Sequence, residues 1–399
     1  MSHQDVGIVM PIYRQRPEYL TTALQSILQQ EYPHFRLVIV LDGAEPHVID
    51  IIYEAAKHDS RIDVIQLQEN QGLTNALNLG FKRCHQFPSI KYLTWVSSDN
   101  VHYPPFIGTL RSLLETSPSH VGLAYGHYRL INEDGQMAWS TEQEEEFRRV
   151  QQLPKESLLE QNLIGAAFLY RTNFAEQVGA YRYDTVDDYD YWLRLTEHCD
   201  IIYTPTTLME YRIGSTTSLS SQIVTSKQSV RTFRNLIHQV RLEARQRRGI
   251  AVETSVIYCM EEGSEQEINQ LESFQYQIAS NYNFIIVDRS PVGQIQRLLS
   301  VIPDPRYRYY GMAGMNEEAC FRSLVPNIYT PYIFWFGVER FLYVNALAQL
   351  LERLKQAGNH GTTYLNDQHQ PVSQLHLTSA DPRKFHLYGT EELKRHLGY

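Results

Sequence analysis

Polar residues follow directly after an apolar stretch that begins at Tyr92. The segment YLTWVSSDNVHYP starts as a buried strand would and turns polar at Ser97, Ser98, Asp99 and Asn100. Such residues would lie at the carboxyl end of a strand, where open α/β sheets bind their ligands. The same pattern is typical of a plain Asp-Asn turn, so this segment alone leaves a ligand site and a turn equally open.

Carboxylates recur at two other places that could take part in the same chemistry. Asp42 ends an apolar run and precedes a glycine, and the segment DDYDYWLRL brings together Asp187, Asp188 and Asp190. Because strand ends in a doubly wound sheet converge on one crevice, a single ligand could contact both Asp42 and Asp99. A simple turn and a solvated acidic helix start are the plainer alternatives for these two places.

The segments before residue 100 would position these groups. Apolar runs predict strands at residues 6–12, 35–41, 62–67 and from 92, and helical periodicity predicts helices at 17–30, 46–57 and 73–84. This strand–helix–strand order predicts parallel strands joined by right-handed crossovers. The expected fold class is α/β, with a mostly parallel sheet flanked by helices.

The composition argues against several classes of protein. The 399 residues carry a net charge of −9, with a pI near 5.9, which disfavours a nucleic-acid partner. No run approaches the length of a membrane span, and the first residues lack the basic region of a signal peptide. The four cysteines are far apart, which favours reduced thiols and a cytoplasmic location. Neither a Gly-x-Gly-x-x-Gly nor a Gly-x-x-x-x-Gly-Lys motif is present, so a dinucleotide oxidoreductase and a P-loop NTPase are disfavoured.

The order of motifs over residues 5–220 resembles one family. The blocks are PIYRQRPEYL, ALQSILQQEYP, VLDGA, NQGLTNALNLG, WVSSDN, LIGAAFLYR, VGAY, DDYDYWLRL and MEYR. They are similar, in sequence and order, to the family 2 glycosyltransferases, which have the GT-A fold. The resemblance implies an inverting transfer of sugar from a nucleotide-diphosphate sugar, of the UDP or TDP type, to a hydroxyl acceptor.

The same resemblance implies roles for individual residues. Asp99 would hold Mg²⁺ or Mn²⁺, and Asp188 would be the general base. The nucleotide sugar would be bound by Pro11, Ile12, Tyr13, Asp42, Asn70, Asn78 and Ser98. The acceptor side would comprise Gly165, Ala166, Asp187 and Trp192.

Several positions depart from the family pattern. Ser97 replaces the first aspartate of the Asp-x-Asp motif, and Asn100 stands where a further aspartate is common. Leu77 replaces an arginine, and no histidine follows the Tyr-Arg pair at 211–212. Each change removes a charge or a ligand near the phosphates, so the dependence on a metal stays open.

The second half of the chain predicts a linking helix and a repeat. Residues 221–248 form a basic helical pattern, either a linker with a solvated basic face or a contact with an anionic membrane surface. From residue 250 the chain mirrors its first half: 282–288 resembles 35–42, 332–340 resembles 92–100, and 387–399 resembles 169–181. The expected domains are 1–220, the linking helix 221–249, and a smaller, degenerate GT-A-like domain at 250–399. Residues 337–340, GVER, stand where the first half has its candidate metal ligand, so this domain would serve packing, dimerisation or acceptor positioning.

Two readings of the function remain. The first is a glycosyltransferase of bacterial surface glycan synthesis that acts on a glycan, lipid-linked or protein acceptor, in the cytoplasm or at the inner face of the membrane. The second is a catalytically inactive scaffold with the same fold that binds partners. A sugar nucleotidyltransferase is disfavoured because the segment YRQRP after the first strand contains no glycine.

Overall fold

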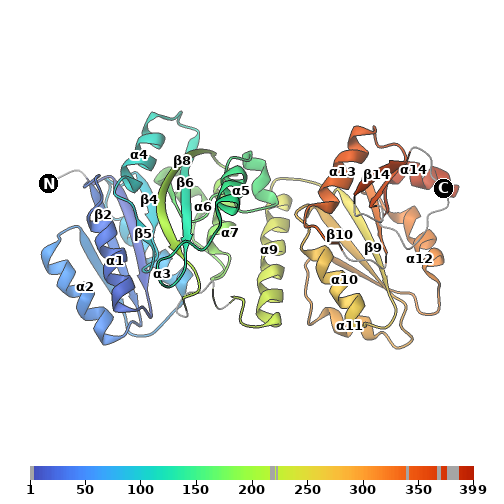
Figure 1. Cartoon of the computed structure of the whole chain (residues 1–399), viewed down its shortest axis with the longest axis horizontal. Coiled ribbons are helices and arrows are strands. Elements are labelled where there is room, and N and C mark those ends of the chain that lie inside the picture. Colours follow the sequence, from blue (N-terminus) through green and yellow to red (C-terminus); the bar gives the residue numbers. More distant parts are fainter. Residues whose placement is uncertain (1–3, 216–220, 222, 338–340, 366–369, 375–385) are drawn as a thin grey trace. The chain divides into compact units, whose positions relative to one another are not determined.

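The computed structural model describes residues 4–215, 221, 223–337, 341–365, 370–374 and 386–399. The chain forms two compact units, Met1–Ser229 and Val230–Tyr399 (Figure 1). Val338, Glu339 and Arg340 correspond, in the predicted repeat, to the segment with the candidate metal ligand. They lie outside the described residues. Among the described helices, none combines the length and the apolar character that a membrane crossing requires.

The first unit is built on an eight-stranded sheet with the order β3-β2-β1-β4-β7-β6-β8-β5. Its strands are β1 (Val6–Ile12), β2 (Phe35–Asp42), β3 (Ile62–Leu67), β4 (Tyr92–Trp95), β5 (Val101–His102), β6 (Val121–Ile131), β7 (Phe168–Arg171) and β8 (Asp200–Arg212). The first four pair in parallel, whereas β7 runs antiparallel to both β4 and β6. The predicted α/β class with a mostly parallel sheet is therefore confirmed.

Helices flank this sheet (Figure 1). They are α1 (Pro17–Leu28), α2 (Pro46–His58), α3 (Leu73–Cys84), α4 (Phe106–Thr116), α5 (Thr141–Gln151), α6 (Thr172–Val178) and α7 (Asp187–Leu195), with a short 3₁₀ turn at Lys155–Leu159. Helix α3 packs very closely on β1, because a Cβ at Gly80 would lie 2.3 Å from Cγ1 of Val9. The start of α3 lies at the carboxyl end of the sheet, where the N–H of Gly72 bonds to Asp42, the last residue of β2.

The second unit has a seven-stranded sheet with the order β11-β10-β9-β12-β15-β13-β14. The strands are β9 (Thr254–Met260), β10 (Tyr282–Asp288), β11 (Tyr307–Gly311), β12 (Tyr332–Phe336), β13 (Thr362–Leu365), β14 (Pro371–Gln374) and β15 (His386–Gly389). The helices are α9 (Lys227–Arg247), α10 (Glu265–Gln275), α11 (Gln294–Leu299), α12 (Glu317–Leu324), α13 (Ala346–Gln356) and α14 (Thr390–Leu397), with a 3₁₀ turn at Val325–Asn327. In this sheet, β11-β10-β9-β12-β15 have the same order and relative directions as β3-β2-β1-β4-β7 in the first unit.

The two units also share hydrogen bonds at matching positions. Gln30 donates from its side-chain amide to the carbonyl O of Tyr103 at 2.8 Å, and Gln277 donates in the same way to Tyr343 at 2.8 Å. Each of these glutamines also accepts a backbone N–H from the helix that follows the tyrosine, from Ile107 of α4 and from Leu347 of α13.

A charged pair is repeated with the same geometry. Arg61 binds Asp59 through its backbone N–H, Nε and a terminal nitrogen, at 2.9, 3.0 and 2.6 Å. Arg306 binds Asp304 through the same three groups, at 3.0, 2.8 and 2.6 Å. Each guanidinium also lies over the aromatic ring that begins the neighbouring strand, at 4.3 and 4.0 Å.

The basic helix α9 differs from both expectations for it. Arg231 and Arg234 each bind Glu272 of α10 at 2.9 Å, and Arg245 donates to Ser280 at 3.1 Å. The residues Arg234, Arg241 and Arg245 are buried. The prediction of a solvated basic face is therefore wrong for these three buried arginines, which are not available to a membrane surface. Lys227 and Arg247, at the two ends of α9, are exposed.

Candidate active site

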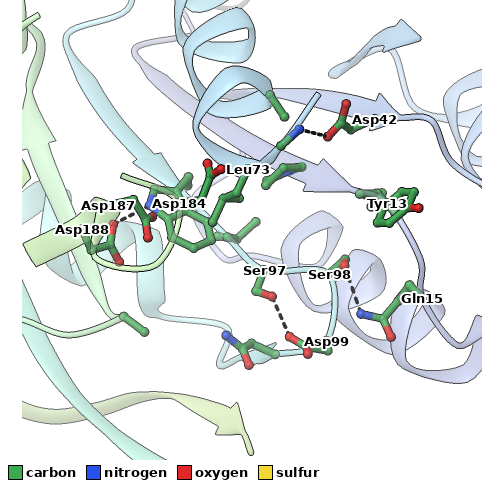
Figure 2. A pocket seen from close by; sticks show the side chains of 18 of the residues that line it. Tyr13, Gln15, Asp42, Leu73, Ser97, Ser98, Asp99, Asp184, Asp187 and Asp188 are labelled. Atoms are coloured by element: carbon green, nitrogen blue, oxygen red, sulfur yellow. Dashed lines mark hydrogen bonds between the residues drawn. The ribbon is translucent and has the colours of Figure 1, made fainter. Parts of the chain in front are cut away.

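A cavity of about 500 Å³ lies in the first unit, where β1, β2 and β4 end (Figure 2). The described residues that line it include five aspartates and one arginine. These are Asp42, Asp99, Asp184, Asp187 and Asp188, together with Arg14. Such an excess of carboxylates attracts cations and opposes a phosphate-rich anion unless a cation accompanies it.

Asp42, the last residue of β2, is 3% exposed and holds the loop that leads to α3. Its Oδ1 accepts the N–H of Gln71 at 2.8 Å, and its Oδ2 accepts the N–H of Gly72 at 3.1 Å and the side-chain amide of Asn70 at 3.0 Å. Burial raises the pKa of the Asp42 carboxyl, and the two backbone N–H groups oppose that rise. Gly72 has a φ of +93°, a conformation that glycine adopts readily, so the loop can turn toward the carboxylate.

Asp99 lies in the turn after β4 and is held by its neighbours. Ser97 donates its hydroxyl to Oδ1 of Asp99 at 2.6 Å. Arg212 donates its Nε to the carbonyl O of Asp99 at 3.2 Å and its backbone N–H to the side chain of Asn100 at 2.9 Å. Burial raises the pKa of the Asp99 carboxyl, while Ser97 and the charge of Arg212 oppose that rise.

Asp187 and Asp188 form the first turn of α7 and lie side by side in Figure 2. Trp95, the last residue of β4, donates its indole N–H to Oδ1 of Asp188 at 2.8 Å. Burial raises the pKa of Asp188 to about 7, against the effect of this bond. Burial and the adjacent charge of Asp188 raise the pKa of Asp187 well above its usual range. The pair can therefore take up a proton near neutral pH, which a general base must do.

Two contacts attach the loop before α7 to helix α3. Oδ1 of Asp184 accepts the backbone N–H and the hydroxyl of Thr74, at 2.9 and 2.6 Å. Asn78 donates to the carbonyl O of Tyr181 at 3.1 Å and accepts its N–H at 2.8 Å. The amide of Asn78 therefore holds this loop, whereas the sequence predicted that it binds the nucleotide sugar.

Most of the residues predicted for the site line one cavity. Besides the aspartates, the predicted residues found there are Pro11, Ile12, Tyr13, Asn70, Ser98 and Ala166. Asn78, Gly165 and Trp192 are not part of the lining. Trp192 is fully buried and packs edge-on against Phe168, with ring centroids 4.5 Å apart. Gly165 has a φ of +66° and faces the ring of Tyr128, which a Cβ would meet at 2.4 Å.

The lining also contains residues that the sequence did not single out. Gln15 donates to the hydroxyl of Ser98 at 3.1 Å, so it joins the segment after β1 to the segment after β4. Trp95, Asp184 and Tyr211 also line the cavity. Asp184 could have been proposed because it lies three residues before the acidic cluster, whereas an aromatic residue at the end of a strand gives no such signal.

The described residues contain no group of three or more histidine, cysteine, aspartate or glutamate side chains placed to hold a metal ion. A divalent cation that is bound mainly by phosphates requires only one or two carboxylates from the protein. Asp99 meets that smaller requirement, and the Ser97 hydroxyl beside it is a further oxygen.

Comparison with known proteins agrees with this geometry. Residues 7–179 match the family model of glycosyl transferase family 2. The first unit therefore belongs to glycosyl transferase family 2, and the expected GT-A type fold is confirmed for it.

Individual relatives match only parts of their own length. An uncharacterized glycosyltransferase of Rickettsia conorii is 26% identical over 219 residues, which are 53% of this chain and 35% of the relative. TuaG of Bacillus subtilis, named a teichuronic acid biosynthesis glycosyltransferase, is 32% identical over 95 residues, which are 24% of this chain and 36% of TuaG. The crystal structure of TarS 1-349 of S. aureus with UDP-GlcNAc has a TM-score of 0.46 at 14% identity, over 59% of this chain and 66% of that chain. The chain spans about a third of the length of the first two curated relatives that it matches.

Proposed function

We propose that this protein is a glycosyltransferase that moves a sugar from a nucleotide-diphosphate sugar to a hydroxyl acceptor. The observation that carries the proposal is one cavity, in a family 2 domain, that contains Asp42, Asp99 and Asp188. In Figure 2, Asp42 lies at one side of the pocket view and Asp188 at the other. This separation suits a substrate with a nucleotide at one end and a reacting sugar at the other.

Asp42 would bind the nucleobase and select a uracil or thymine base. Its Oδ2 already accepts two hydrogen bonds, whereas Oδ1 accepts one and keeps a free lone pair. That lone pair can accept one N–H, which the imide group of uracil or thymine provides. Guanine presents two adjacent donors and would need both oxygens. The amino group of cytosine is a donor, but the ring nitrogen beside it is an acceptor that would face the carboxylate. A UDP- or TDP-sugar therefore fits best.

The diphosphate would bind with a divalent cation near Asp99. The five aspartates of the lining repel phosphate groups, and Arg14 alone offsets little of that charge among the described lining residues. Mg²⁺ or Mn²⁺ held by Asp99 and the phosphates would supply the missing positive charge and stabilise the leaving group. Ser97, in place of an aspartate, would orient Asp99 through its hydroxyl.

Asp188 would act as the general base. The acceptor O–H proton moves to the Asp188 carboxylate while the acceptor oxygen forms a bond to the anomeric carbon. The bond from that carbon to the diphosphate breaks, and its electrons leave with the nucleotide diphosphate. This direct displacement inverts the configuration of the anomeric carbon. Asp187 and Ala166 would lie on the acceptor side of the cavity.

The acceptor would be a bacterial surface glycan or a lipid-linked or protein precursor of one. The name of TuaG supports this class, because it refers to teichuronic acid biosynthesis. A reaction that uses a nucleotide sugar would take place in the cytoplasm or at the inner face of the membrane.

The second unit would be a degenerate copy of the first that has no catalytic role. The shared strand order, the matching glutamine contacts and the repeated Asp-x-Arg pair support an origin by duplication. Domain boundaries near 220 and 250 and a role in dimerisation or acceptor positioning remain predictions.

Thermal unfolding with nucleotides tests the proposal. UDP, TDP, GDP and CMP are each added with and without Mn²⁺ to the parent protein and to Asp99→Asn. A ligand at a hundred times its dissociation constant adds about 2.7 kcal/mol of stability. We expect stabilisation by UDP or TDP that requires Mn²⁺ and is lost in Asp99→Asn. Stabilisation by none of the nucleotides would favour the alternative, a partner-binding scaffold.

A further inference from the structure

Trp95 donates a hydrogen bond to Asp188, the candidate base, although the two residues are far apart in the sequence. Its indole N–H lies 2.8 Å from Oδ1 of Asp188, and the two residues are 93 positions apart. Trp95 ends β4, and Asp188 is in the first turn of α7. The bond therefore connects the central sheet to the helix that carries the acidic cluster, at the wall of the cavity.

The indole ring is held in place by the elements around it. Trp95 pairs with Val9 in the parallel ladder between β1 and β4. The ring packs edge-on against Phe168 of β7, with centroids 6.4 Å apart, and Phe168 packs in turn against the buried Trp192. A donor that one strand carries and that packs against the adjacent strand is a rigid support for a functional side chain.

The chemistry of the indole group determines what this bond can do. An indole N–H donates a hydrogen bond and cannot accept one. It therefore engages one lone pair of Oδ1 of Asp188 in the ionised state and never competes for the acceptor's proton. The bond lowers the basicity of Oδ1, so Oδ2 is the better site for that proton. A donor to a carboxylate also stabilises its charged form, which burial at this position disfavours.

We propose that Trp95 is the positioning residue of the candidate base: its indole N–H holds Oδ1 of Asp188, so that Oδ2 receives the proton of the acceptor hydroxyl. This inference rests on the proposed role of Asp188. If Trp95 only filled space, the loss of its N–H with an aromatic ring kept in place would have no effect on the protonation of Asp188.

The indole resonances provide a test that needs no substrate. The chain contains four tryptophans, so ¹⁵N labelling of tryptophan gives a simple spectrum in which Trp95→Phe identifies one resonance. In the parent protein we expect the Trp95 resonance to shift between pH 5 and pH 9 with a midpoint near 7, the pKa of Asp188. This titration should disappear in Asp188→Asn. A Trp95 resonance that does not titrate, or that titrates equally in Asp188→Asn, would overturn the proposal.

The pH dependence of the reaction provides the second test. The measured rate is UDP release from UDP-glucose, or TDP release from TDP-glucose where the nucleotide panel selects TDP. We expect Trp95→Phe to raise the pH midpoint of the acidic limb of the kcat/KM profile by about 1 to 2 pH units, because the donor that stabilises the carboxylate is gone. Trp335→Phe is the matched control, since Trp335 occupies the same register in β12 as Trp95 in β4, and it should leave the limb unchanged.

The outcomes separate this proposal from the proposed function. An unchanged acidic limb in a folded Trp95→Phe protein would refute the positioning role and leave Asp188 as the base. Parental transfer by Asp188→Asn, with the Trp95 titration present in the parent, would refute Asp188 as the base and the role of Trp95 with it. If Trp95→Phe fails to fold, the titration is compared between the parent and Asp188→Asn, with the resonance assigned from the spectrum of the parent.

Discussion

Replacement of Asp42 by asparagine should change which nucleotide the protein prefers. The asparagine carbonyl would keep the position of Oδ2, where it accepts from Asn70 and Gly72, so the amide NH₂ would take the position of Oδ1. There it would face the N–H of Gln71, which is a second donor, and the imide N–H of a uracil base. Both interactions with Oδ1 would be lost together.

The size of the effect follows from these contacts. A hydrogen bond to a charged group contributes about 1.5 to 3 kcal/mol, so the affinity for UDP should fall about 10- to 150-fold. The unpaired N–H of Gln71 should destabilise the first unit by about 1 to 3 kcal/mol. CDP should gain relative to UDP, because the ring nitrogen of cytosine can accept from the new NH₂ group.

Isothermal titration with UDP and CDP measures these changes. The matched control is Asp288→Asn, since Asp288 ends β10 as Asp42 ends β2 and accepts bonds from Ser290 and Tyr309 at 2.8 and 2.7 Å. The control should destabilise the second unit and leave the UDP affinity unchanged. An unchanged UDP affinity in Asp42→Asn would refute the reasoning about the base.

Two further predictions concern stability. Burial raises the pKa of Asp188 to about 7 in the folded state, so between about pH 4 and 7 the folded state binds more protons than the unfolded state and loses stability as the pH rises. Asp188→Asn should therefore unfold at a higher temperature than the parent at pH 8, with a smaller difference at pH 5. An equal difference at both pH values would contradict this. Asp304→Asn should cost about 3 to 5 kcal/mol in denaturant unfolding because its partner Arg306 would remain buried without a counter-charge, whereas Asp59→Asn should cost clearly less because Asp59 and Arg61 are about a fifth exposed. Equal losses in the two variants would show that burial does not determine the strength of this repeated pair.

The sequence predicted the elements from β1 to β4 closely because each shows a clear local pattern. Buried parallel strands are continuous apolar runs, and helices such as α1 place apolar side chains on one face. The convergence of Asp42 and Asp99 on one cavity followed from the same topology, since Asp42 ends β2, Asp99 follows β4, and both strands pair in parallel with β1.

Contacts between distant residues could not be predicted in this way. The arginines of α9 read as a solvated face because their partner Glu272 lies about forty residues away. Asn78 matched a family motif, but its amide is taken up by Tyr181, about a hundred residues later in the chain. Trp192 lies one helical turn after Asp188, on the same face of α7. It is fully buried and packs against Phe168, so this face contributes a cavity residue in its first turn and a core residue one turn later.

The most direct test of the central claim is the release of nucleotide diphosphate from UDP- and TDP-sugars by the parent protein and by Asp188→Asn, with nucleotide affinity measured on both. The proposed function predicts release by the parent, a loss of at least 100-fold in Asp188→Asn, and nucleotide affinity retained in that variant. Equal release by the two proteins would contradict the assignment of the base. Absence of both release and nucleotide binding in the parent would contradict the transferase itself.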